Sequence, residues 1–259
     1  MLASNSPASK VIQKVPNGLC IRFILAFVLL ATPFRAEEPP PDLAQRVALR
    51  ETEDEKARGE YTYRQTVEVQ EVDTRGGAVG QYHEVRDIIF SPEKERTEKE
   101  IGKPYSTLQR LILTPEDFRD IREIQPFLFT ADQRPLYETR FRGDETMDGV
   151  ECWVLQVKPR QILEGQRLFD GMLWVSKKDY ATVRTEGQAV PPIITSKSEN
   201  LFPHFTTIRK PIDGDHWFPV HTYADDLLPF RTGPQRIRLI MRYSNYRRFG
   251  AESTIEYAK

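Results

Sequence analysis

The chain has 259 residues, with 37 Lys and Arg against 38 Asp and Glu, so its formal net charge is −1. This balance disfavours nucleic-acid binding, because phosphate contacts need an excess of clustered Lys and Arg. Two Cys and 14 Gly exclude a disulfide scaffold and a collagen-like chain. A hydrophobic content of 39% is enough for one sizeable core.

Residues 1–36 have the layout of an export signal. Basic residues without any acid precede the uncharged run Phe23–Thr32. A run of ten residues favours a cleaved signal over an anchor, because a spanning helix needs about 20. We therefore predict export, cleavage near Ala36 and a single mature domain over residues 37–259. This domain keeps only Cys152, so it cannot form an intramolecular disulfide.

The first predicted elements of the mature chain are a helix and a hairpin. Asp42–Arg58 follows three prolines, carries apolar residues near its start and ends at a glycine, which predicts an amphipathic helix. Tyr61–Val72 and Val79–Phe90 alternate and are rich in β-branched and aromatic residues. The turn residues Asp73–Gly77 lie between them, so we predict a long β-hairpin.

The middle of the chain carries weaker signals. Arg96–Ile101 and Leu108–Leu113 are candidate strands. A short helix is expected to start at Thr114 as N-cap, with Pro115 in its first turn, and to end before Pro126.

The second half reads almost entirely as strands separated by turns. The predicted strands are Tyr137–Arg142, Glu151–Lys158, Leu168–Ser176, Thr182–Gln188, His204–Lys210, Trp217–Asp225 and Gln235–Tyr246. No alternation of strands and helices supports a parallel sheet. The expected fold class is mainly β with helices (α+β), an antiparallel sheet curled around its helices.

Sequence motifs for common enzyme classes are absent. The chain has no phosphate-binding loop, dinucleotide fingerprint, nucleophile elbow or zinc-protease helix. His221 with Asp225 or Asp226 is the best cluster for general acid–base chemistry, and it leaves a hydrolase as a minor alternative. The four histidines lack the spacing of a metal site, so we expect no metal, no cofactor and no catalytic residue. Cys152 lies in an apolar strand and is expected to be buried and unreactive.

One face of several strands is apolar. Trp153, Leu155 and Val157 alternate along one strand, and Trp174 lies in a neighbouring one. Ile237 and Leu239 share a face of the last strand with Met241 and Tyr243. The first six of these residues are the candidate lining of a hydrophobic cavity. The same pattern also fits ordinary core against the helices.

Several stretches resemble the lipoprotein-carrier-like family that sorts outer-membrane lipoproteins in envelopes with two membranes. They are Tyr61–Val67, Thr114–Asp120, Gly149–Pro159, Phe169–Val175, Glu199–Phe205, Ile212–Pro219, Ala224–Asp226 and Tyr243–Phe249. The resemblance covers most of residues 42–250 and is closest to an uncharacterised branch. It implies an unclosed antiparallel half-barrel with helices in its concave face. No functional residue is carried over, because Arg64, Arg86 and Arg142 do not align with the family's early-strand arginine.

These observations lead to a functional hypothesis. We expect a periplasmic, monomeric and non-enzymatic protein that binds lipid, an acylated protein segment or another hydrophobic ligand, with peripheral membrane contact at most. An envelope sensor or scaffold that binds a protein partner with the same sheet is the alternative.

Overall fold

The computed structural model describes residues 38–91, 95–124, 126–196 and 199–248. The predicted export signal therefore lies outside the described residues. The helices are α1 (Leu43–Arg58), α2 (Pro115–Glu123) and the short 3₁₀ helix η1 (Arg134–Leu136). The strands are β1 (Tyr61–Val72), β2 (Ala78–Phe90), β3 (Arg96–Glu100), β4 (Tyr105–Ser106), β5 (Tyr137–Met147), β6 (Val150–Pro159), β7 (Leu168–Ser176), β8 (Thr182–Val190), β9 (Ile193–Ile194), β10 (Glu199–Asn200), β11 (Phe205–Ile212), β12 (His216–Leu228) and β13 (Gln235–Arg248).

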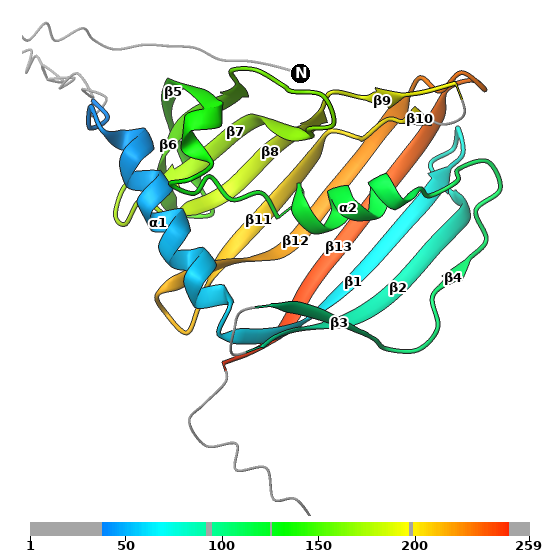
Figure 1. Ribbon diagram of the computed structural model, residues 1–259, viewed down its shortest axis with the longest axis horizontal. Coiled ribbons are helices and arrows are strands. Elements are labelled where there is room, and N and C mark those ends of the chain that lie inside the picture. The colour runs from blue at the N-terminus through cyan, green and yellow to red at the C-terminus, as the bar shows by residue number, and fades with distance from the viewer. Residues whose placement is uncertain (1–37, 92–94, 125, 197–198, 249–259) are drawn as a thin grey trace, which may run out of the picture. The chain divides into compact units, whose positions relative to one another are not determined.

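Eleven strands form one sheet in the order β3-β2-β1-β13-β12-β11-β8-β7-β6-β5, with β4 beside β2 (Figure 1). Every paired neighbour runs antiparallel. The outermost strands β3 and β5 do not pair with each other, so the sheet is unclosed. The predicted fold class and the antiparallel arrangement are therefore confirmed.

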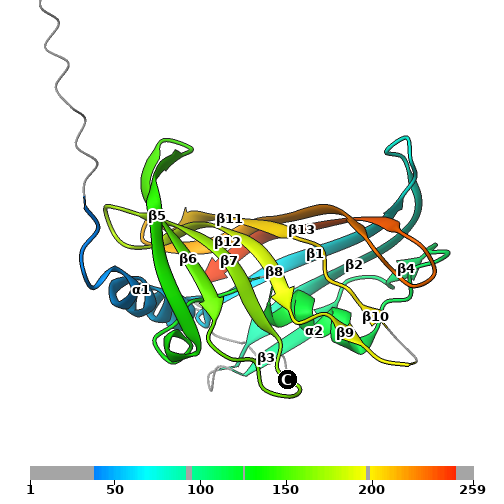
Figure 2. The same ribbon diagram turned by 90° about the horizontal axis from the view of Figure 1, so that it is seen from above.

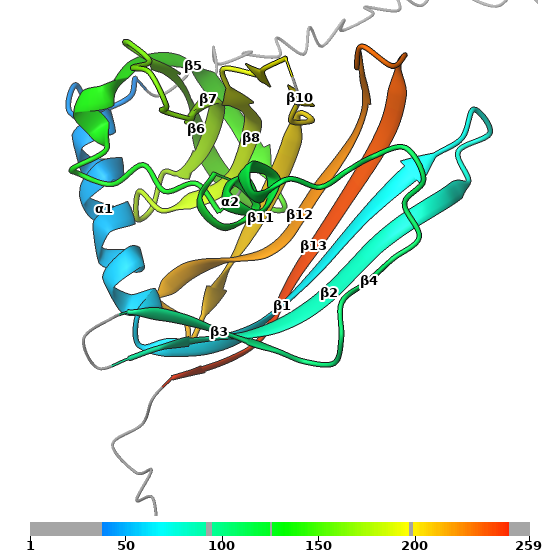
Figure 3. The same cartoon turned by 45° about the vertical axis from the view of Figure 1, so that its right-hand side comes forward.

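Both α-helices lie on the same face of the sheet, and the sheet curls around α2 (Figures 2 and 3). The strands send every second side chain toward this concave face. In β1, for example, Tyr61, Tyr63, Gln65, Val67 and Val69 are all buried. One continuous apolar cluster joins these strands to both helices. The expected position of the helices, inside the concave face, is confirmed.

Local chemistry explains the first hairpin. The Asp73 carboxylate accepts hydrogen bonds from the backbone N–H groups of Arg75 (2.9 Å) and Gly77 (2.8 Å). Gly76 between them has φ +86°, a left-handed conformation that glycine adopts without steric strain. The Asp-Thr-Arg-Gly-Gly stretch thereby turns the chain where the sequence predicted it.

The candidate strand at Leu108–Leu113 is wrong, because these residues are irregular. Their backbone bonds to a side chain instead of to a neighbouring strand. The buried Glu71 carboxylate accepts from the N–H groups of Gln109 (2.9 Å), Arg110 (2.6 Å) and Leu111 (2.5 Å). A charged acceptor that satisfies three consecutive donors replaces the ladder of a strand.

Two close glycines bring β7 and β8 together. Gly171 lies opposite Gly187 in the strand register. A β-carbon at Gly187 would stand 2.3 Å from the Asp170 carbonyl oxygen and 2.8 Å from the Gly171 α-carbon. The Phe169 ring lies over both glycines and stacks on Phe127, with 4.4 Å between ring centroids. The glycines thus leave room for an aromatic side chain of the core.

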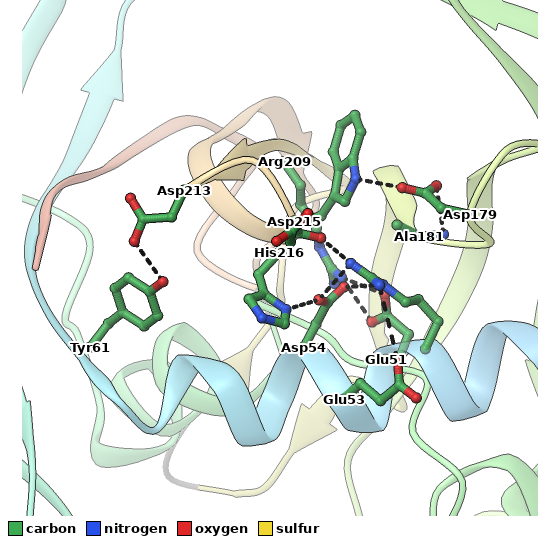
Figure 4. Close-up of polar contacts among 12 residues, drawn as sticks. Glu51, Glu53, Asp54, Tyr61, Asp179, Ala181, Arg209, Asp213, Asp215 and His216 are labelled. Carbon is green, nitrogen blue, oxygen red and sulfur yellow. Dashed lines mark hydrogen bonds and ion pairs between the residues drawn. The ribbon is translucent and has the colours of Figure 1, made fainter. Parts of the chain in front are cut away.

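A buried ion pair attaches α1 to the sheet (Figure 4). Arg209 of β11 and Glu51 of α1 lie 2.8 Å apart, and both side chains are almost fully buried. The Arg209 guanidinium also donates to the Phe127 carbonyl oxygen. Close by, the His216 ring nitrogen Nδ1 lies 3.0 Å from a carboxylate oxygen of the buried Asp54. One arginine thereby fixes three parts of the chain: α1, β11 and the segment that follows α2.

Candidate ligand-binding site

An apolar pocket lies between the sheet and α2. The sheet supplies Val69 from β1, Leu228 from β12, and Ile237 and Leu239 from β13. All four side chains are buried. They come from three adjacent strands and face the concave side, because each strand alternates with a period of two.

The opposite wall of the pocket is formed by residues 109–124, which we call the roof. The roof contributes the apolar Leu111, Leu113 and Ile121 together with Asp117, and the segment Leu201–Pro203 closes one side. The volume of the pocket is about 30 Å³. A volume of this size is about that of one water molecule, so an acyl chain fits only if the roof moves away from the sheet.

The start of α2 is fixed by a capping box. The Asp117 backbone N–H donates to the Thr114 hydroxyl (3.3 Å), and the Thr114 backbone N–H donates to the Asp117 carboxylate (2.6 Å). Phe118 then packs edge to face against Tyr82 of β2, with 5.6 Å between ring centroids. The sequence predicted this helix start correctly, since Thr, Pro and Asp occupy their preferred positions.

Two carboxylates, the half-buried Asp117 and the buried Asp120, attach α2 to neighbouring segments. Asp117 accepts a hydrogen bond from the Asn200 side chain (2.8 Å), and Asp120 forms an ion pair with Arg167 (2.9 Å). Arg167 also donates to the Asn200 side-chain oxygen. Burial raises the pKa of Asp120 from 3.8 to about 6, and the Arg167 charge offsets only part of this effect. The roof is therefore attached through charged and polar contacts as well as apolar ones.

The raised pKa of Asp120 predicts a pH dependence of stability. Folding favours the protonated carboxyl, so this contribution is full below about pH 4 and is lost as the pH rises through about 6. Relative to the variant Asp120→Asn, the parent should lose about 2 kcal/mol of unfolding free energy between pH 4 and pH 7. Urea unfolding of both proteins across this range measures the difference. A difference that does not change with pH would contradict the prediction.

The six candidate cavity residues do not lie together. Ile237 and Leu239 line the pocket. Trp153, Leu155 and Val157 are buried on the same concave face but outside the pocket. Trp153 stacks instead on Tyr180, with 5.6 Å between ring centroids. These three side chains belong to the core in the described conformation.

Trp174 lies on the other face of the sheet. The register places Trp174 opposite Val154, whereas Leu173 faces the concave side opposite Leu155. Trp174 belongs to a small second cluster with Cys152, and its indole N–H donates to Glu145 (2.6 Å). Trp174, a candidate lining residue in the sequence analysis, therefore does not lie on the concave face with Trp153.

Asp225, His221 and Cys152, the other candidate reactive residues, are held by ion pairs or by burial. Asp225 forms ion pairs with Arg236 (2.6 Å) and Arg238 (3.0 Å), and hydrogen bonds from both lower its pKa. Burial lowers the pKa of His221, and neither residue lines the apolar pocket. Cys152 is fully buried, and this burial raises its pKa to about 11. The predicted burial of the Cys152 thiol is confirmed. The Asp225 carboxylate is paired with two arginines.

Among the described residues, no group of three or more His, Cys, Asp or Glu could hold a metal ion. In the same ranges, no helix is both long and apolar enough to cross a membrane.

No family model matches the chain, and no curated protein matches it. Several solved structures are similar in layout. A DUF1329 family protein from Desulfovibrio piger has a TM-score of 0.39 at 14% identity, over 83% of this chain and 96% of its own. A LolA superfamily protein from Nitrosomonas europaea has a TM-score of 0.35 at 14% identity, over 83% and 97%. A putative outer membrane lipoprotein-sorting protein domain from Vibrio parahaemolyticus has a TM-score of 0.36 at 13% identity, over 80% and 94%.

The complex of MucA and MucB from Pseudomonas aeruginosa is also similar, with a TM-score of 0.23 at 12% identity over 81% of this chain and 99% of that one. In that structure the MucB protein is bound to a protein partner, MucA. At these identities the similarities concern the fold alone. The fold class itself follows from the strand order and pairing.

Proposed function

We propose that this protein is an exported, periplasmic and non-enzymatic carrier that binds an acyl chain or another apolar segment between its sheet and the roof. The observation that carries the proposal is the apolar pocket, whose wall on one side is a short helix attached by polar side chains. A carrier needs such a wall, because a bound chain must enter and leave.

The attachment of α2 supports reversible opening. Only Asp120 and Ile121 are fully buried among the nine residues of this helix. Lifting α2 would expose the apolar side chains that line the pocket, which a bound chain would cover again. The polar groups of α2 would gain water in exchange for their partners, at a net cost of about 1 kcal/mol for each hydrogen bond. An acyl chain that buries about 200 Å² of apolar area would contribute about 5 kcal/mol. The two quantities are of similar size, as a carrier requires.

A matched pair of variants tests the site. Leu239→Phe adds volume inside the pocket, whereas Leu155→Phe makes the same change on the same face outside it. We expect Leu239→Phe to weaken binding of a fluorescent fatty-acyl probe about tenfold, and Leu155→Phe to leave the affinity of the folded protein unchanged. Urea unfolding of both variants separates loss of affinity from loss of fold.

Lipid that copurifies with the envelope-extracted protein provides the direct test, with mass spectrometry as the readout. Bound acyl lipid in the parent and its depletion in Leu239→Phe are the expected results. Absence of both copurified lipid and probe binding in the parent would overturn the proposal.

A protein partner is the second candidate, and β5 is the feature that favours it. This eleven-residue strand ends the sheet, and most of its residues are exposed. An exposed edge offers backbone groups to which an extended peptide can add as a further strand. If the lipid tests fail, crosslinking of envelope proteins to a photoreactive residue at Arg140 would test this alternative directly.

A further inference from the structure

A second cavity lies beside the apolar pocket. It has a volume of about 420 Å³. Leu111 lines both cavities. Elsewhere the two linings use neighbouring positions of the chain: the apolar pocket has Leu113, Leu201 and Leu228, and the larger cavity has Thr114, Glu199 and Phe230. The two cavities therefore lie on either side of the same short segments.

Arg110 gives the larger cavity a positive charge. Its guanidinium donates to the Thr232 carbonyl oxygen (3.5 Å), and it makes no ion pair within the described part of the chain. Among the described residues of the lining, the other two charged ones, Arg231 and Glu199, form an ion pair with each other (3.2 Å). Their charges cancel, so Arg110 sets the net charge of the described part of the lining.

Gln235 adds an unsatisfied polar group to the same lining. The residue is only 7% exposed. Its side-chain nitrogen donates to the Thr232 hydroxyl (3.3 Å), while its side-chain oxygen has no partner among the described residues. A buried amide without a full set of partners is costly unless a ligand supplies the missing bond.

The apolar side of the cavity suits the neck of an amphiphile. Phe230 and Leu111 contribute to the lining, and Ile112 is 82% exposed at its edge. An exposed isoleucine beside an unpaired arginine offers contacts to both parts of a molecule whose chain and headgroup meet there.

We propose that this cavity binds the anionic headgroup of a single-chain amphiphile, with Arg110 as the counter-charge and the acyl chain in the apolar pocket. The inference rests on the proposed function, because it assigns a headgroup to the same ligand. It restricts the ligand class to amphiphiles that carry a phosphate or a carboxylate.

Three ligands with the same oleoyl chain test the proposal: lysophosphatidic acid, oleate and the neutral monoacylglycerol. Each displaces a fluorescent acyl probe from the full protein, its variant Arg110→Gln, and the control Arg160→Gln. The control removes another exposed arginine, which does not line the cavity. In the parent and the control, we expect at least one anionic ligand to bind about tenfold more tightly than the neutral one, and this preference to weaken at high salt.

In Arg110→Gln the preference should fall to about twofold, with the affinity for the neutral ligand unchanged. The ranking of lysophosphatidic acid against oleate then identifies phosphate or carboxylate as the headgroup. Equal affinity of all three ligands in the parent, or an unchanged preference in Arg110→Gln, would overturn the headgroup site and leave the carrier proposal standing. Failure of all three ligands to bind would instead overturn the carrier proposal itself.

Discussion

Replacing Arg209 with methionine should destabilise the protein by about 3–5 kcal/mol. The variant Arg209→Met leaves the Glu51 carboxylate charged and almost fully buried without its partner, and it removes the donor to the Phe127 carbonyl oxygen. Breaking a buried ion pair costs more than the pair contributes, because the remaining charge has lost both water and countercharge. Urea unfolding monitored by tryptophan fluorescence measures the loss.

A double variant separates charge from packing. Glu51→Met combined with Arg209→Met replaces both charges with apolar side chains and should recover most of the lost stability. As an exposed comparison, Arg248→Met breaks the surface pair with Glu60 and should hardly move the urea midpoint. The explanation fails if Arg209→Met is as stable as the parent, or if the double variant is no better than the single one.

Gly187→Ala should lower the melting temperature by about 6–12 °C, which corresponds to about 3 kcal/mol for a domain of this size. The added methyl group would meet the Asp170 carbonyl oxygen and the Gly171 backbone, neither of which can rotate away, and it would displace the Phe169 ring. Gly77→Ala is the matched control, because its nearest contact is the Asp73 side chain at 3.5 Å. Thermal unfolding of the two variants decides the matter, and equal melting temperatures would refute the close-approach argument.

The sequence was sufficient for the parts of the fold that depend on local chemistry. The hairpin of β1 and β2 alternates with a period of two and carries its own turn residues, and α2 carries its own cap. Leu108–Leu113 also looks extended and apolar in isolation. Its conformation is decided by Glu71, a residue nearly forty positions away, so a local pattern could not reveal it.

The facing of Trp174 shows a second limit. In Met172–Val175 both alternate positions are apolar, so periodicity cannot decide which side faces the core. The register against β6 decides, and it turns Trp174 to the outer face. Two of the four sheet residues of the pocket, Ile237 and Leu239, were predictable from alternation, whereas the residues of the roof depend on tertiary contacts.

A signal for the buried ion pair was present in the sequence but is easily overlooked. Glu51 continues the apolar stripe of Leu43 and Val47 at intervals of four residues, which places it on the buried face of α1. Arg209 follows Phe205 and Thr207 at intervals of two on the inward face of β11. When two elements each carry a residue of opposite charge on their apolar face, the two residues are expected to form a buried ion pair.

The pairing of β1 with β13 determines the order in which the sheet can be completed. The first strand ends at Val72, and its partner begins at Gln235, although the two lie side by side in the middle of the sheet (Figure 1). The hairpins on either side join strands that are consecutive in the chain, so they can form early. The pairing of β1 with β13 requires nearly the whole chain. Until β1 and β13 pair, each is an edge strand with free backbone groups, which makes the partly folded protein the species most prone to aggregation.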